Sequence, residues 1–167
     1  MHCLSEPSYT KIHRCLRGIH AQSLDARQSR AHTRQHADSR TPIHTRVRAT
    51  TIMNIVIVED SELIRTHLLD IVATQPRIHV IGVATEEEAA ISLIMATAPD
   101  AVLLDLSLAP GSGIRVLKRI RAAGCAARVL VLTNNIEPAL RKACVAVGVS
   151  GFFDKSFEAE QDRKSVV

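Results

Sequence analysis

The chain has no long apolar run and no regular cysteine pattern. No stretch of its 167 residues approaches the ~18–20 apolar residues that a membrane-spanning helix needs, and the N-terminal part lacks the apolar core of a secretory signal. The four cysteines follow neither metal-ligand spacing nor a disulfide-rich pattern, so we expect reduced thiols. These absences exclude membrane-spanning and disulfide-stabilised proteins. We expect a soluble, cytoplasmic protein with no membrane partner.

Acidic residues are scarce at the N-terminus. The first fifty residues hold three acids against nine Lys or Arg, a net charge of +6, whereas the remainder carries −2. The few apolar residues of this stretch show no sustained period, so burying them cannot offset the entropy lost on ordering. We therefore expect residues 1–52 to be a disordered basic extension, residues 53–160 to form the folded domain, and residues 161–167 to be a C-terminal tail.

Three interpretations of the extension stay open. Its Arg-rich, Ser-rich, acid-poor composition is typical of an organellar transit peptide, and also of a polycation that contacts nucleic acid. We favour a third interpretation, an upstream stretch without its own function that follows from a mis-assigned start, because Met53 directly precedes the first predicted strand. Nucleic acid is accordingly not the partner we expect, although the basic extension leaves it open.

Apolar runs and helix-like stretches alternate from Met53 onward. Strand-like runs cover 54–58, 78–83, 101–105, 128–132 and 150–153. Between them lie helix-like stretches at about 61–74, 85–97, 112–122 and 136–147, with a weak further candidate from 156 onward. Repeated strand–helix units with right-handed crossovers predict an α/β fold, a doubly wound five-stranded parallel sheet with helices on both faces.

Polar residues indicate where some helices begin. Thr85 and Glu88 have the spacing of a capping box, and Ser112 is a candidate N-cap for the next helix. The run Glu86–Glu88 is predicted to be an exposed first helical turn, where the helix dipole favours acids, and not a second metal site.

Five polar residues follow the carboxyl ends of predicted strands. They are Glu59 and Asp60 after the first strand, Asp105 at the third, Thr133 after the fourth, and Lys155 after the fifth. The carboxyl ends of parallel strands share one edge of the sheet, where ligands bind. The sequence therefore predicts a pocket of three carboxylates, one hydroxyl and one ammonium group.

The order and spacing of these residues resemble the receiver domain of bacterial two-component response regulators. Asp105 follows Asp60 by 45 residues, Thr133 follows after 28 more, and Lys155 after another 22. The resemblance covers roughly residues 53–157. It implies a flavodoxin-like sheet of strand order 2-1-3-4-5 and a non-enzymatic signalling protein that accepts a phosphoryl group on Asp105 from a histidine kinase or phosphotransfer protein.

The resemblance also implies a Mg²⁺ cofactor and roles for the other site residues. The implied metal ligands are the carboxylates of Glu59, Asp60 and Asp105 and the backbone carbonyl of Ser107. Lys155 would supply a fixed cation for the phosphate, and Thr133 a hydroxyl that moves toward it. These residue types suit the chemistry, because phosphoryl transfer depends on positioning and charge neutralisation, and Mg²⁺ prefers hard oxygen ligands.

A conformational switch is a further implication. In receivers an aromatic residue on the fifth strand rotates behind the strand-four hydroxyl, and Phe152 stands at that position, three residues before Lys155. We expect phosphorylation to shift the population of conformations on the face around residues 136–153. A downstream protein would bind this face, and dimerisation on phosphorylation is an open outcome.

Several residues depart from the family pattern. Ala109 stands at the family's usual proline position in the loop after Asp105, and Pro110 follows it. Asn134 is larger than the residue often found after the strand-four hydroxyl. Ser156 replaces a frequent proline after the lysine, so no cis peptide is expected there.

We expect a stand-alone receiver, because no output module such as a helix-turn-helix is visible after residue 157. Two other classes stay open. One is a phosphorylation-independent interaction module with a vestigial pocket. The other is an aspartate-nucleophile phosphatase, which is disfavoured because Ser107 occupies the place of its second aspartate and removes the usual general acid.

Overall fold

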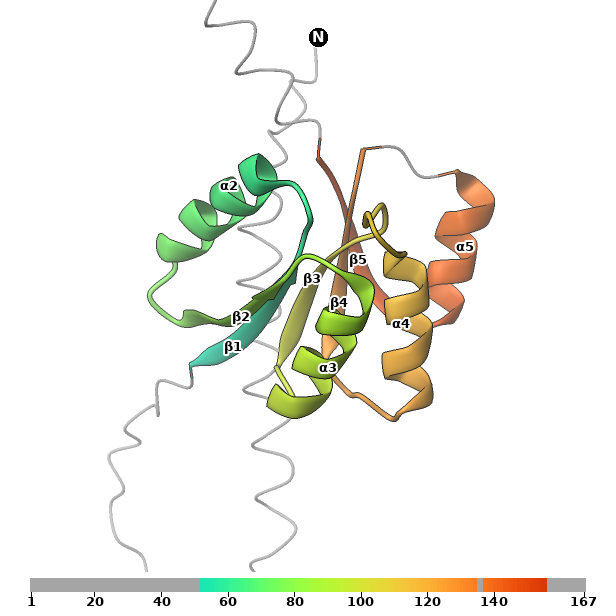
Figure 1. The fold of residues 1–167 in the computed structure, drawn as a ribbon, viewed down its shortest axis with the longest axis horizontal. Coiled ribbons are helices and arrows are strands. Elements are labelled where there is room, and N and C mark those ends of the chain that lie inside the picture. The colour runs from blue at the N-terminus through green and yellow to red at the C-terminus, as the bar shows by residue number, and fades with distance from the viewer. Residues whose placement is uncertain (1–51, 135–136, 156–167) are drawn as a thin grey trace, which may run out of the picture.

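The computed structural model describes residues 52–134 and 137–155, in which strands and helices alternate along the chain (Figure 1). Their bounds are β1 (Met53–Val58), α2 (Glu62–Ala73), β2 (Ile78–Ala84), α3 (Glu87–Thr97), β3 (Ala101–Asp105), α4 (Gly113–Ala122), β4 (Arg128–Thr133), α5 (Pro138–Ala146) and β5 (Val149–Asp154). Each lies within two residues of its predicted bounds. Residues 1–51 of the predicted extension, the helix candidate from 156 onward and the tail 161–167 lie outside the described residues.

All five strands are parallel and lie in the order β2-β1-β3-β4-β5, which confirms the predicted doubly wound sheet. The order reverses between β1 and β3, which are hydrogen-bonded neighbours although α2, β2 and α3 separate them in the chain. In open sheets of this kind, ligands bind outside the carboxyl ends of the strands at this reversal. Glu59, Asp60 and Asp105 lie at this reversal, where β1 and β3 end.

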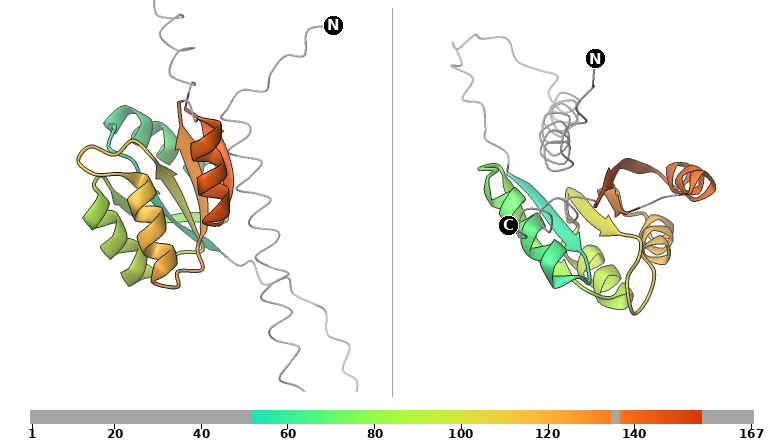
Figure 2. Two further views of the ribbon diagram at one scale, coloured as in Figure 1. Left: turned by 90° about the vertical axis from the view of Figure 1, so that its right-hand side faces the viewer. Right: turned by 90° about the horizontal axis from the view of Figure 1, so that it is seen from above.

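Helices cover both faces of the sheet. Alternate side chains of β1 and β3, such as Ile57 and Leu103, pack with α2, whereas their neighbours, such as Val58 and Leu104, pack with α3, α4 and α5. The latter three helices stand side by side in the left view of Figure 2. Strands that are buried on both faces have continuously apolar sequences. For this reason the apolar runs of the sequence could be interpreted as strands.

The start of α3 differs from the prediction. The helix begins at Glu87, its N-cap position is Glu86, and no side chain caps it, so the capping box expected at Thr85 and Glu88 is wrong. The expectation that all of Glu86–Glu88 is exposed is also wrong for Glu87, which is buried. The physical reason is tertiary: Glu87 turns inward to accept hydrogen bonds from Ser112 and Arg115.

Candidate functional site

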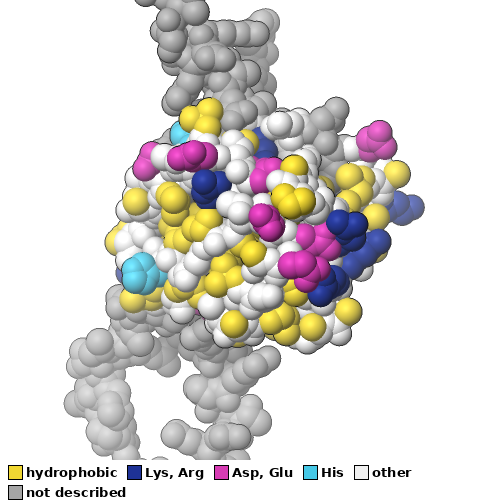
Figure 3. Space-filling view, viewed as in Figure 1, with side chains coloured by type: hydrophobic (Ala, Val, Ile, Leu, Met, Phe, Trp, Pro, Cys, Tyr) yellow, Lys and Arg dark blue, Asp and Glu magenta, His cyan; other side chains and the backbone are white. Residues whose placement is uncertain are grey.

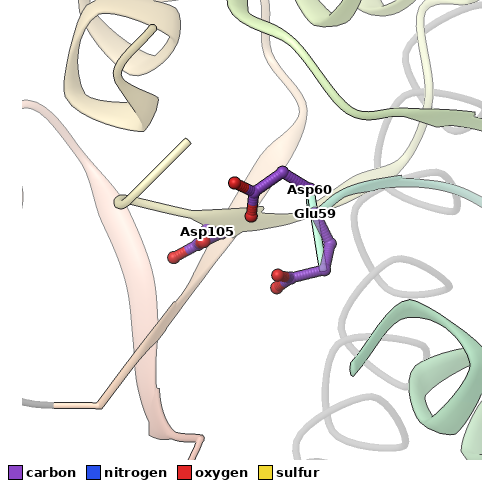
Figure 4. Close-up of side chains that lie close together, drawn as sticks. All are labelled: Glu59, Asp60 and Asp105. Atoms are coloured by element: carbon purple, nitrogen blue, oxygen red, sulfur yellow. The ribbon is translucent and has the colours of Figure 1, made fainter. Parts of the chain in front are cut away.

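Three carboxylates gather at the carboxyl ends of β1 and β3. Glu59 and Asp60 directly follow β1, and Asp105 is the last residue of β3. One oxygen from each lies within 4.8 Å of the other two, and Figure 4 shows the three side chains converging on one space. Glu59 and Asp105 are buried, whereas Asp60 is partly exposed. The sheet topology thus brings together acids that are separated by 45 residues in the chain.

Lys155 supplies the positive charge of this pocket. Its Nζ lies 2.7 Å from Asp105 Oδ2 and 2.7 Å from Glu59 Oε2, and its side chain is only 5% exposed. The Lys155 backbone N–H donates to the carbonyl of Thr133 at 3.0 Å, which ties the residue after β5 to the end of β4. The ammonium group therefore bridges two buried carboxylates from a fixed backbone position.

Glu59 is the most deeply buried of the three acids. Its Oε1 accepts a hydrogen bond from the Ser61 backbone N–H at 3.2 Å. Burial raises the pKa of Glu59, an effect that the neighbouring Asp105 charge adds to and that Lys155 opposes. The Glu59 Oε2 lies 2.7 Å from the Lys155 Nζ, so the buried carboxylate is ion-paired. Three clustered carboxylates beside one ammonium group suit a hard divalent cation.

The loop after β3 closes the pocket through its backbone. The Ser107 N–H donates to Asp105 Oδ1 at 3.0 Å, and the Ala109 N–H donates to Asp60 Oδ2 at 3.0 Å. The Ser107 side chain is exposed, and a ligand role for its carbonyl stays a prediction. The peptide bond between Ala109 and Pro110 is cis.

Thr133 and Phe152 lie on the β4–β5 side of the site. Thr133 ends β4 and is buried, 9% exposed. Phe152 pairs with Val131 in the sheet register and is partly buried, and the guanidinium of Arg141 on α5 lies 4.5 Å from the centre of its ring. The described residues thus connect the end of β4 both to the pocket and to the α5–β5 face.

Arg65 is a site residue that the sequence analysis missed. Its Nη1 donates to the backbone carbonyls of Glu59 at 3.2 Å and Asp60 at 3.1 Å, so it holds the acidic pair from the first turns of α2. The sequence signal was weak, since an arginine five residues after an acidic pair on a helix ordinarily faces solvent. Arg65 thus ties the backbone that carries the acidic pair to the first turn of α2.

The fold and the site define a class of α/β protein with an acidic pocket and a buried lysine at the strand-order reversal. Residues 55–166 match the response regulator receiver domain family, and the chain belongs to that family. Among curated proteins, it is 25% identical to the DNA-binding transcriptional activator DevR/DosR of Mycobacterium tuberculosis, over 69% of this chain and 53% of that protein. It is 26% identical to the nitrate/nitrite response regulator protein NarL of Escherichia coli K12, over 67% of this chain and 52% of that protein.

Solved structures agree with this assignment. A two-component response regulator of the LuxR family from Aurantimonas sp. SI85-9A1 is similar with a TM-score of 0.57 and 28% identity, over 61% of this chain and 73% of that chain. The response regulator domain of Thermotoga maritima CheB is similar with a TM-score of 0.58 and 27% identity, over 64% and 80%. The chain spans about half the length of the curated relatives named above. None of the described helices is both long and apolar enough to span a membrane.

Proposed function

We propose that this protein accepts a phosphoryl group on Asp105 from a histidine kinase or phosphotransfer protein and signals through a changed protein-binding face. The observation that carries the proposal is the setting of the Asp105 carboxylate. It lies at the end of β3, within 4.8 Å of two other acidic ligand atoms, 2.7 Å from a buried ammonium, and 3.0 Å from a backbone N–H. Receiver domains are mostly not enzymes, and we assign no catalytic turnover to this one.

In the proposed reaction an Asp105 oxygen attacks the phosphorus of a phosphohistidine. The new bond is the P–O bond of an aspartyl phosphate, the P–N bond breaks, and the imidazole leaves and takes up a proton from solvent. Lys155, already in contact with Asp105, then offers its charge to the phosphoryl oxygens. Such a group lowers the barrier because negative charge on the phosphoryl oxygens must be stabilised in the transition state.

Mg²⁺ fits the residues that surround Asp105. Glu59, Asp60, Asp105 and the Ser107 carbonyl would hold it, since all four are hard oxygen donors and the three clustered carboxylates carry more negative charge than Lys155 neutralises. When bound, the ion would neutralise charge on the phosphoryl group. Without it, two buried carboxylates share the single charge of Lys155, and Asp60 adds a third negative charge nearby.

We propose that Thr133 and Phe152 relay the phosphorylated state to the face around residues 136–153. Support comes from the short path between them: Lys155 contacts Asp105, its backbone bonds to the Thr133 carbonyl, and Phe152 lies one strand away beneath Arg141. A downstream protein would read this face, and a second phosphorylated copy is an alternative reader. Every residue of the proposed phosphoacceptor site lies between 59 and 155, so these residues should suffice to accept the phosphoryl group.

The test is incorporation of labelled phosphate from acetyl phosphate with Mg²⁺. Wild type should incorporate label, Asp105→Asn should not, and Asp60→Ala should incorporate it far more slowly. No incorporation by wild type, together with intact binding of a partner, would favour the phosphorylation-independent module. Many turnovers of a phosphomonoester would favour the phosphatase. Transfer from a panel of phosphorylated histidine kinases then identifies the donor.

A further inference from the structure

Glu87 stands out among the three consecutive glutamates at the start of α3. Glu86 and Glu88 are exposed, whereas Glu87 is 8% exposed. One of its oxygens, Oε2, accepts the backbone N–H of Ser112 at 3.0 Å and the Arg115 Nε at 2.7 Å, and also lies 2.7 Å from Arg115 Nη2. The proposed phosphoacceptor reaction gives this buried carboxylate no role.

Glu87 completes the N-terminus of the neighbouring helix α4. Ser112 is the N-cap of α4, yet its side chain makes no capping hydrogen bond, and the first turn contains no acid. A capping box would place Glu or Gln three residues after the N-cap to accept the N-cap backbone N–H, but that residue is Arg115, which can only donate. Arg115 instead holds Glu87, which accepts the Ser112 N–H from another helix. The result is a capping box assembled across two helices.

This contact fixes one end of the loop that follows Asp105. Gly111 of the loop packs closely against Glu87. Its φ is +119°, and a Cβ added to it would lie 2.6 Å from the Glu87 Cβ. At the same end, the Gly113 N–H donates to the Leu106 carbonyl at 3.1 Å, and a Cβ on Gly113 would lie 1.9 Å from the carbonyl oxygen of Asp105. A movement of the α4 N-terminus is therefore transmitted to the backbone of Asp105.

The same loop carries the backbone hydrogen bonds that orient Asp105 and Asp60. Ser107 donates to Asp105 and Ala109 donates to Asp60, so the two carboxylates depend on the path of the loop between Leu106 and Ser112. We propose that Glu87 is a positioning residue for the phosphoacceptor site: by anchoring Ser112, it holds the loop so that Ser107 and Ala109 reach Asp105 and Asp60. This inference rests on the proposed function and extends it to a residue outside the pocket.

The chain offers a matched control one residue away. Glu88 pairs with Arg119, again between α3 and α4, but both side chains of this pair are exposed, at 73% and 50%. Acidic and basic side chains adjoin each other over these two helices in Figure 3. Among the described residues, Glu88 accepts no hydrogen bond from the loop. Replacing Glu88 should therefore leave the loop in place.

The experiment compares Glu87→Gln, Glu87→Ala and the control Glu88→Gln in the full chain, at a temperature where melting curves show each variant to be folded. Phosphorylation by acetyl phosphate at saturating Mg²⁺ should slow on the order of 10-fold in Glu87→Gln and up to about 100-fold in Glu87→Ala, because small displacements of reacting groups cost this much. Glu88→Gln should react as wild type does. A double variant, Glu87→Gln with Arg115→Glu, places an acid at the capping-box position of α4 and should recover part of the rate.

Amide chemical shifts supply a readout that needs no phosphate. The Ser107 and Ala109 amides should shift in both Glu87 variants, return toward wild type in the double variant, and stay unchanged in Glu88→Gln. If wild type accepts phosphate while the Glu87 variants keep both its rate and these amide shifts, the inference is wrong and the proposed function stands. If wild type accepts no phosphate, the proposed function fails, and the amide shifts alone decide whether Glu87 positions the loop.

Discussion

Replacing Lys155 with methionine removes the only buried cation within 4 Å of the described acids of the site. Lys155 is 5% exposed and lies 2.7 Å from both Glu59 and Asp105, whose side chains are 0% and 3% exposed. Methionine has a similar length, so the change removes charge with little change in packing. Two buried carboxylates are then left close together without a counter-charge.

Leaving a buried charge unpaired costs about 3–5 kcal/mol of folding stability. A loss of about 3 kcal/mol corresponds to roughly 12–24 °C in the melting temperature of a domain of about 100 residues. The loss should depend on pH. Lys155 opposes the rise in the pKa of Glu59, so its removal raises that pKa further. A carboxyl group whose pKa is higher in the folded than in the unfolded state binds more protons when the protein is folded. Its burial therefore lowers the folding stability most at pH values above that raised pKa.

The assay is thermal unfolding followed by circular dichroism, without divalent ions, at pH 8 and at pH 5.5. Lys155→Met should fall well below wild type at pH 8, and the difference should shrink at pH 5.5, which is nearer to the raised pKa of Glu59. The control Lys142→Met removes an exposed lysine of α5 and should stay within about 0.5 kcal/mol of wild type. Equal stability of Lys155→Met and wild type at pH 8, or a loss that does not change with pH, would show that Lys155 does not offset the charge of these buried carboxylates.

Three further outcomes are expected. Mg²⁺ affinity should fall as the pH falls toward the raised pKa of Glu59, because protons compete with the metal for its carboxylate. If calorimetric titrations give the same Mg²⁺ affinity at each pH, Glu59 is not a ligand. A chain that begins at Met53, the first residue of β1, should keep its melting temperature and its phosphorylation; loss of either would assign residues 1–52 to the domain. Thr133→Ala should still accept phosphate, but beryllofluoride should no longer shift the amides of the face around residues 136–153; shifts equal to those of wild type would exclude Thr133 as the relay.

The sheet could be predicted because its physics is local. Parallel strands buried on both faces must be continuously apolar, so runs such as 101–105 mark β3 without knowledge of the partner strands. The convergence of Glu59, Asp60 and Asp105 then follows from strand direction and the position of the order reversal. Only the sheet order and the spacing of these acids were needed to locate the pocket.

The surroundings of the pocket could not be predicted in the same way, because they depend on tertiary pairing. Glu87 was expected to be solvated, since three adjacent glutamates at a helix start satisfy the helix dipole without any partner. Its real partners, Ser112 and Arg115, lie 25 and 28 residues away on another helix. Arg65 was missed for a related reason, because its bonds go to backbone carbonyls, which leave no trace in the residue types.

The most direct test of Asp105 as the phosphoacceptor is to map the phosphorylated residue. After transfer from a phosphorylated histidine donor, the protein is digested and the acyl phosphate is located by mass spectrometry, with Asp70→Asn, an exposed position on α2, as the control variant. We expect one modification, on the peptide that contains Asp105, present in the Asp70 variant and absent in Asp105→Asn. Modification of Asp60 or of a residue outside the pocket, or an unchanged yield in Asp105→Asn, would contradict it.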